Sequence, residues 1–273
     1  MTFMPGALAV FAMAAALTAL PYLAGADSWL AVIKVTSSLG YLALALGAVR
    51  GAMTFDRGDV LRRAWLWISA GGVLGFVSCL ISGPPLRALS ENLRNTPGGE
   101  AIGVATDIGL NVTMVMGLVM FTRAWSQTGL VPPWQRPAAL LAFTVGVAVA
   151  GPSLWHDTHA ALAGSGPAIG STISDLGDIA SMTLVGPLLA SAVWMRGGAL
   201  VGPYIYLTGC AIAWLMFDAG SLIFAGHYSN GYDMFFSVLG NLFGGLAGLT
   251  HYWVIRSRSR AIDSPRGGAK NSA

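Results

Sequence analysis

Acidic side chains inside apolar segments are the groups in this chain best suited to chemistry. Asp107, Asp178 and Asp218 each lie in a long apolar run, and Asp175 lies just ahead of Asp178. A carboxylate in hydrocarbon is costly unless it is paired, hydrated or used, so such acids are enriched at ion and ligand sites. Counting from the basic residue at the inner end of each expected helix predicts similar depths for Lys34, Asp107 and Asp178, roughly 24 to 27 Å at 1.5 Å per residue.

These positions predict one polar cavity that opens to the outer face of a membrane. The expected lining consists of three acids, two amides and one lysine: Asp107, Asp178, Asp218, Asn111, Asn241 and Lys34. Carboxylates that share a poorly solvated site cannot all ionise cheaply, so the cavity is expected to hold a cation, a proton or a small polar ligand. In the competing interpretation the acids are solvated at the interface, Lys34 forms an ordinary ion pair, and Asp175 caps the start of its helix.

Histidine and cysteine provide weaker candidates for a site. His156 and His159 flank Asp157 near one helix end, and His227 is expected on the same side. Imidazoles and a carboxylate are ligands for zinc or copper, but this spacing does not supply three ligands of defined geometry. His251, near the inner end of the last helix, is a weaker metal candidate still. The two cysteines fall in different expected helices and indicate neither a disulfide nor a metal site.

The elements that position these groups are expected to be membrane-spanning helices. Hydrophobic residues make up 55% of the 273-residue chain and charged residues only 10%, with a mean hydropathy of +0.65. A spanning helix needs roughly 20 apolar residues. Eight segments meet or nearly meet that length: 6–24, 30–49, 64–83, 103–122, 137–155, 174–195, 203–225 and 234–255. The fold class is therefore an all-α polytopic membrane bundle over residues 1–255, followed by a disordered basic tail at 256–273.

A repeated phrase suggests that the bundle consists of four similar helical hairpins. Leu39-Gly40, Ile108-Gly109, Leu176-Gly177 and Leu239-Gly240 each open a long apolar run at spacings of 69, 68 and 63 residues. Repeats that cross a membrane twice keep the same orientation, so the four glycines are expected at similar depth. Glycines at near-helical intervals on these helices predict seams where helix backbones approach closely.

Basic residues predict the orientation. Twelve of the 15 lysines and arginines fall on one side of the expected helices, which places that side and the C-terminus in the cytoplasm of a bacterial-type inner membrane. Trp65 and Trp125 fall at expected inner boundaries, as members of an aromatic belt would. A net charge of +3 on such a chain is a topology signal, and nucleic acid is not an expected partner.

The first apolar run has two interpretations. Residues 7–23, followed by Ala24-Gly25-Ala26, resemble a signal peptide with its cleavage site, which would leave seven helices. No basic residue precedes Lys34, however, and the run completes the first hairpin, so a retained helix is favoured.

Two outer loops are expected to be long. Residues 83–101 place Leu86, Leu89 and Leu93 at helical spacing beside charged residues, which is typical of a short helix in the headgroup region. Residues 155–174 are rich in glycine, alanine and serine and are expected to form a loop.

The later helices resemble the multi-pass sensory modules of some bacterial histidine kinases and diguanylate cyclases. The stretches that carry the resemblance run from Leu176-Gly177-Asp178 to Pro187, from Tyr204 to Asp218, and from Asp233 to Gly248. Those modules similarly pair an acid early in one helix with an acid late in the next. The resemblance covers about residues 174–250 and implies a sensory role, although no output domain follows Trp253 here.

The expected function is that of a non-enzymatic inner-membrane protein: a ligand-responsive sensory module or a subunit of a membrane complex. Its expected partners are the lipid bilayer, a protein partner or a second copy, and a small ligand or cation. One alternative is a small transporter or channel for a cation, a proton or a small polar solute. The other is a membrane enzyme with an outer-side metal. The sequence indicates no particular cofactor and no complete catalytic constellation.

Overall fold

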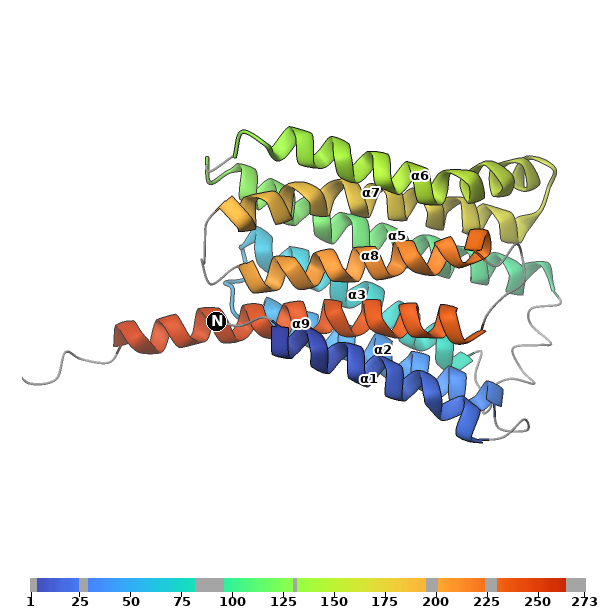
Figure 1. Cartoon of the computed structure of the whole chain (residues 1–273), viewed down its shortest axis with the longest axis horizontal. Helices are drawn as coiled ribbons and strands as arrows, with labels where there is room; N and C mark the ends of the chain where they lie inside the picture. The colour runs from blue at the N-terminus through green and yellow to red at the C-terminus, as the bar shows by residue number, and fades with distance from the viewer. Residues whose placement is uncertain are drawn as a thin grey trace, which may run out of the picture.

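The structure, a computed structural model, describes residues 4–24, 29–81, 96–129, 132–194, 201–223 and 230–263. Across these ranges the chain forms eight α-helices and no strand, as expected from the sequence (Figure 1). They are α1 (Met4–Ala24), α2 (Trp29–Ala52), α3 (Val60–Ile81), α5 (Pro97–Ser126), α6 (Gln135–Leu162), α7 (Gly166–Trp194), α8 (Val201–Ile223) and α9 (Asn230–Asp263).

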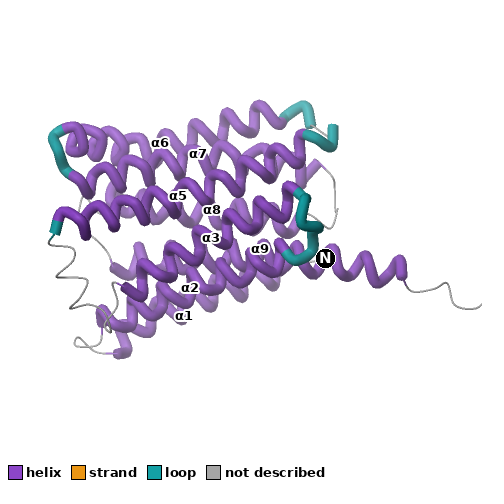
Figure 2. The backbone as a smooth tube through the Cα atoms, turned by 180° about the vertical axis from the view of Figure 1, so that it is seen from behind, coloured by secondary structure: helices purple, strands orange, loops and turns teal. Residues whose placement is uncertain are grey.

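Length and apolar character make this a multi-pass membrane protein. In the part of the chain that the structure describes, seven helices, all except α8, are long and apolar enough to cross a membrane. α8 has 23 residues and carries Asp218 close to its end. Successive helices run in opposite directions, so their connections fall at two ends of the bundle (Figure 2). We name these the α2–α3 end, with the turn at 53–59, and the α6–α7 end, with the turn at 163–165.

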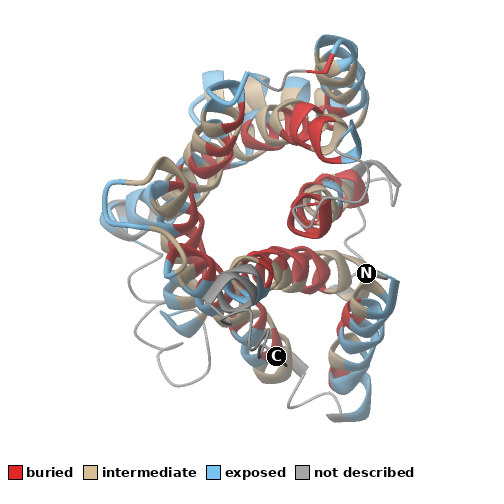
Figure 3. Cartoon of the chain, turned by 90° about the vertical axis from the view of Figure 1, so that its left-hand side faces the viewer, coloured by how far each residue is buried: buried red, intermediate tan, exposed pale blue. Residues whose placement is uncertain are grey.

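Six helices form a closed ring. Each packs against the next in the order α2, α3, α5, α7, α8, α9, and α9 closes the ring against α2. α6 packs outside the ring on α7 and α8, and α1 packs outside it on α9 and α2. In the end-on view of Figure 3, α1, beside the N label, is largely exposed. The ring is therefore the structural core, and its interior is where polar side chains can be shielded from lipid.

The connection between α6 and α7 differs from the expected long loop at 155–174. α6 continues to Leu162 and α7 begins at Gly166, because alanine-rich and serine-containing residues sustain both helices. Gly164, with φ at 95°, makes the short turn in a conformation that favours glycine. Asp175 is consequently well inside α7 and does not cap its start, which corrects that interpretation.

The end of α9 differs from the expectation, and two expected segments lie wholly or partly outside the described residues. α9 continues to Asp263, past the start of the expected tail at 256, so the first part of that segment is helical. Residues 264–273 lie outside the described ranges. So do residues 82–95, which hold the leucines of the headgroup helix expected at 83–101.

A glycine seam holds α2 and α9 together. A Cβ added at Gly47 would collide with the backbone carbonyl of Gly245, and one added at Gly248 would collide with that of Gly47. Neither backbone can yield locally, so these positions require glycine for the helices to approach this closely. The seam expected from the sequence is present at this interface.

Several hydroxyl groups in the described helices are satisfied within their own helix. Thr144, Thr183 and Thr208 each donate to the carbonyl four residues earlier, at 2.7 to 2.9 Å. This bonding lets a polar side chain sit in an apolar environment without a partner on another helix. A carboxylate has no proton to donate to a carbonyl when it is ionised, so the acids need a different environment.

An aromatic cluster fills the ring near the α2–α3 end. It consists of Trp65, Phe121, Trp125, Tyr204 and His251. The Trp65 indole donates to Nδ1 of His251 at 3.0 Å. Trp65 and Trp125 are 0% and 6% exposed, so they belong to the core and not to the interfacial belt expected from the sequence.

Candidate functional site

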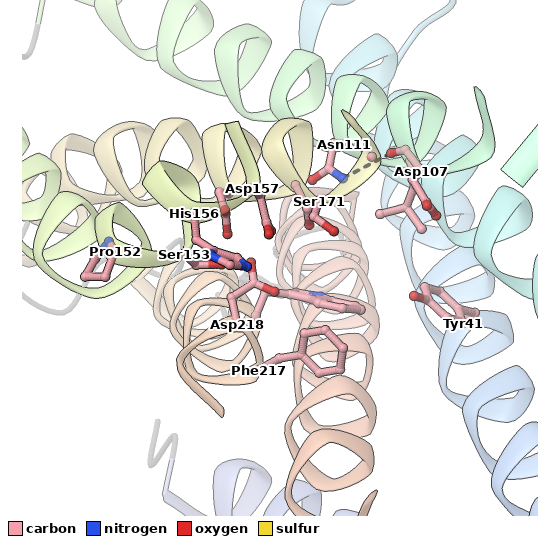
Figure 4. Close-up of a pocket in the computed structure, with 15 residues that line it drawn as sticks. Tyr41, Asp107, Asn111, Pro152, Ser153, His156, Asp157, Ser171, Phe217 and Asp218 are labelled. Carbon is pink, nitrogen blue, oxygen red and sulfur yellow. Dashed lines mark hydrogen bonds between the residues drawn. The ribbon is translucent and has the colours of Figure 1, made fainter. Parts of the chain in front are cut away.

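A cavity of about 670 Å³ lies between α2, α5, α6, α7 and α8, near the α6–α7 end (Figure 4). We call it the acidic cavity, after the aspartates in its lining: Asp107, Asp157, Asp175 and Asp218. Its lining includes His156 but, among the described residues, no lysine or arginine. A concave, poorly solvated surface with several carboxylates concentrates a negative potential and attracts cations.

A smaller pocket of about 50 Å³ continues the acidic cavity into the bundle between α5, α7 and α8. We call it the deep pocket. Asn111 and Trp214 line both spaces, and Asp178 joins the lining of the deep pocket. Apart from Ser174 and Ser181, the remaining walls are mainly apolar and include Leu118 and Leu207, which belong to the same core cluster as Phe121 and Tyr204. The aromatic cluster therefore lies beyond the deep pocket, toward the α2–α3 end.

Asp178 and Asp218 meet where the two spaces join. Their carboxyl groups are in hydrogen-bonding contact between α7 and α8. Asp178 is 8% exposed, so water reaches it little. A hydrogen bond between two carboxyl groups requires one proton between them, because an ionised carboxylate only accepts. The pair can thus hold one proton, or exchange it for another cation.

Asp175 extends the acidic lining toward α6. It is 3% exposed, and the hydroxyl of Ser153 on α6 lies near its carboxylate. Its Oδ2 atom has no hydrogen-bond partner among the described residues. A buried carboxylate oxygen without a donor is costly unless the group is protonated or meets a donor from a molecule in the cavity.

Glycines on α7 allow polar groups of α5 to reach the cavity wall. The side-chain oxygen of Asn111 lies against Gly177, where a Cβ would collide with it. Asp107 Oδ2 lies 3.2 Å from the position that a Cβ would take at Gly170. The Asn111 amide also donates to the Asp107 carbonyl at 3.0 Å. The α5–α7 interface therefore combines close backbone approach with polar side chains that face the cavity.

Aromatic rings form the remaining wall of the acidic cavity. Tyr41, Trp214 and Phe217 lie in series, with ring centroids 6.1 Å apart for Tyr41 and Trp214 and 5.5 Å apart for Trp214 and Phe217. The Tyr41 hydroxyl also lies near the side chain of Ser237 on α9. Aromatic faces beside carboxylates are a combination suited to ammonium groups, which both kinds of side chain attract.

The structure does not bring every expected site residue to this place. Asp107, Asn111, Asp178 and Asp218 line the two spaces, whereas Lys34 and Asn241 line neither. Lys34 is half-buried on α2. Asn241 is fully buried on α9 against Gly40, and neither its amide nitrogen nor its oxygen has a partner among the described residues.

The histidines do not assemble a metal site in the described part of the chain. His156 lines the acidic cavity, but the Nδ1 of His159 lies 2.8 Å from the carbonyl of Trp155 and is occupied there. His227 lies outside the described residues. Within those ranges, no three histidine, cysteine, aspartate or glutamate side chains are close enough to hold one metal ion.

Several lining residues were not expected from the sequence. Ser153 on α6 and Tyr41 on α2 carry no pattern that points to a shared cavity, and Asp157 was expected only beside the histidines of a weak metal motif. Asp175 was assigned to a helix start, and that assignment concealed its burial. The signal that could have found Asp175 was the polar stripe Ser171, Ser174, Asp175 and Asp178, which lies at helical spacing on α7.

Comparison with protein-family models, with curated proteins and with solved structures finds no match to this chain.

Proposed function

We propose that this membrane protein binds a small organic cation in the acidic cavity and responds to it as a sensory module or as a subunit of a complex. The observation that carries the proposal is the lining of the cavity: four aspartates, with Asp178 below them, and no basic side chain other than His156 among the described lining. Such a charge balance is unfavourable without a bound cation or proton.

The dimensions support an organic cation as the ligand. A volume of about 670 Å³ falls in the range of small-molecule sites, and it is large for a bare metal ion. Tyr41, Trp214 and Phe217 offer aromatic faces, on which an ammonium group gains about 0.5 to 2 kcal/mol. The Asp178–Asp218 pair would then receive the charged group at the bottom of the cavity.

A binding role fits the shape of the interior better than a conducting role. The deep pocket ends against apolar side chains, and the aromatic cluster fills the ring beyond it. A conducting pathway needs polar groups or water along its whole length. The basic residues at the α2–α3 end support placing that end in the cytoplasm, so the cavity would face outward.

The sensory role rests on the resemblance of residues 174–250 to sensory modules. In such a module, the ligand would favour one of two helix arrangements, and a partner would detect the difference. α7 and α8 carry the Asp178–Asp218 contact, so a ligand that replaced their shared proton would change the packing of these two helices directly.

The test is equilibrium binding of radiolabelled tetramethylammonium to the full-length protein in nanodiscs. Asp178→Asn and Asp218→Asn should each weaken binding at least about tenfold, because each loses a charge that faces the ligand. Asp56→Asn, an exposed acid in the turn at the α2–α3 end, is the matched control and should bind as the wild type does. Absence of binding to the wild type, or equal losses in all three variants, would overturn the proposal.

A transporter of cations or protons is the second candidate, and the Asp178–Asp218 contact favours it. A carboxyl pair that exchanges one proton for a cation is the basic requirement of coupled exchange. Proteoliposomes with an imposed pH gradient distinguish the two roles. Uptake of labelled tetramethylammonium that depends on Asp178 would establish transport, whereas binding without uptake would leave the sensory role.

A further inference from the structure

A second hollow lies at the α2–α3 end, far along the bundle from the acidic cavity. It has a volume of about 370 Å³ and is open to its surroundings. Its lining comes from the last residues of α2, the turn that follows, and α9: Arg50, Met53, Thr54, Tyr252, Ile255 and Arg256. The glycine seam between Gly47 and Gly248 lies directly beneath, so the two helices that form the hollow are held at a fixed distance.

Two guanidinium groups share one aromatic ring in this hollow. The guanidinium carbons of Arg50 and Arg256 lie 5.8 and 5.5 Å from the centroid of the Tyr252 ring. Arg256 also donates to the Tyr252 hydroxyl. The Tyr252 ring attracts both guanidinium groups, but it carries no negative charge that would neutralise the repulsion between them. Among the described residues, no carboxylate lines the hollow, and both arginines are exposed.

The other lining groups narrow the chemistry of an occupant. Thr54 donates to the carbonyl of Gly51 at 2.6 Å, so its proton is already used. Met53 and Ile255 add apolar surface beside the arginines. The neighbouring Trp253 is 61% exposed on α9, as expected for an indole at the level of lipid headgroups.

We infer that this hollow binds a phosphate group between Arg50 and Arg256, either the headgroup phosphate of an anionic phospholipid or free inorganic phosphate. Guanidinium forks match phosphate oxygens in geometry and charge. A phosphate between the two arginines would offset their mutual repulsion. The apolar side chains beside them would contact the glycerol and upper acyl chain of a lipid. Basic hollows between helices on the cytoplasmic side of membranes commonly take such headgroups.

The experiment measures binding of dioctanoyl phosphatidylglycerol to the purified full-length protein in neutral detergent. The double variant Arg50→Gln/Arg256→Gln should bind about tenfold more weakly, because both phosphate contacts are lost. Arg136→Gln, an exposed arginine near the start of α6 at the same end, is the control and should change binding less than about twofold. The conservative Arg50→Lys/Arg256→Lys variant should lie between the two, since it keeps the charge but loses the fork.

Competition identifies the source of the phosphate. If inorganic phosphate displaces the lipid at comparable concentration, the hollow recognises the phosphate alone. If only the lipid binds, the apolar lining contributes and the site is a lipid site. Unfolding temperatures of each variant separate a lost contact from a lost fold. Equal binding by the wild type and the folded double variant, or an equal loss in the Arg136→Gln control, would refute the inference.

Discussion

Two helix interfaces in the ring contain the same contact and use it differently. At the α5–α7 interface, Asn111 lies against Gly177, and at the α9–α2 interface, Asn241 lies against Gly40. Asn111 is half-buried, donates to the Asp107 carbonyl and faces the acidic cavity. Asn241 is fully buried and has no partner among the described residues. An asparagine against a glycine is therefore not a site by itself.

The surroundings of each contact explain the difference. Next to Asn241, the α9–α2 interface is closed by the glycine seam, where the backbone of Gly47 packs against the backbones of Gly245 and Gly248. The α5–α7 interface has its closest approach at Gly177 and opens beside it into the cavity, where Asp107 and Asp175 add charge. Packing without space produces a structural interface, whereas close packing beside a charged cavity can produce a functional one.

The largest expected effect comes from filling the closed interface. Gly47→Leu should lower the free energy of unfolding by about 3 kcal/mol or more, because its side chain would meet the Gly245 backbone, which cannot yield. Gly103→Leu on α5, where no atom lies within 4 Å of an added Cβ, is the matched control and should change stability little. Thermal unfolding in mild detergent measures both. Equal stability of the two variants would show that close packing of α2 against α9 does not require glycine at position 47.

A smaller loss is expected at the open interface. Gly177→Leu should cost about 2 kcal/mol, because the side chain of Asn111 can move into the cavity and relieve part of the overlap. The displaced amide would occupy ligand space, so tetramethylammonium binding should fall together with stability. Unfolding and equilibrium binding of the same sample test this. A loss of stability with unchanged binding would separate Asn111 from the site.

Substitution of the two asparagines should affect different properties, stability for Asn241 and ligand binding for Asn111. Asn241→Leu should raise the free energy of unfolding by about 1 kcal/mol, since it replaces a buried amide without partners by an apolar group of similar size. Asn111→Leu should leave stability nearly unchanged but weaken cation binding. Unfolding temperatures and binding constants of both variants provide the comparison. Destabilisation by Asn241→Leu would indicate that the Asn241 amide is bonded in the native protein.

The smallest expected effect concerns Ser153. Ser153→Ala removes the hydroxyl in contact with Asp175 and should cost about 0.5 to 1 kcal/mol, because Asp175 can turn toward water in the cavity. Thr144→Ala on the same helix, where the hydroxyl only returns to its own backbone, is the control and should cost less. Chemical unfolding of both variants measures the difference. A larger loss in the control would exclude a specific role for the Ser153 contact.

The sequence by itself determined the class of fold, the eight helices of the described residues and four residues of the candidate site. A long apolar segment in a bilayer must form its backbone hydrogen bonds internally, and the α-helix is the conformation that does so within one segment. All eight segments could therefore be recognised as helices from composition alone. Asp107, Asp178 and Asp218 could be selected because a carboxylate in such a run is conspicuous. Each of the four repeat glycines does lie against a neighbouring helix, as expected, whereas their origin by duplication stays a prediction.

The tertiary structure alone decided which polar groups share a space. Ring order placed α7 between α5 and α8, which brought Asp178 to Asp218 and left Asn241 in the closed α9–α2 interface. It also buried Trp65 and Trp125, which the sequence placed at the membrane boundary. Spacing along one helix fixes depth and facing direction, but contact between helices depends on the order in which they pack, and apolar surfaces in lipid leave that order open. The short Gly164 turn, and with it the burial of Asp175, depended on the same packing.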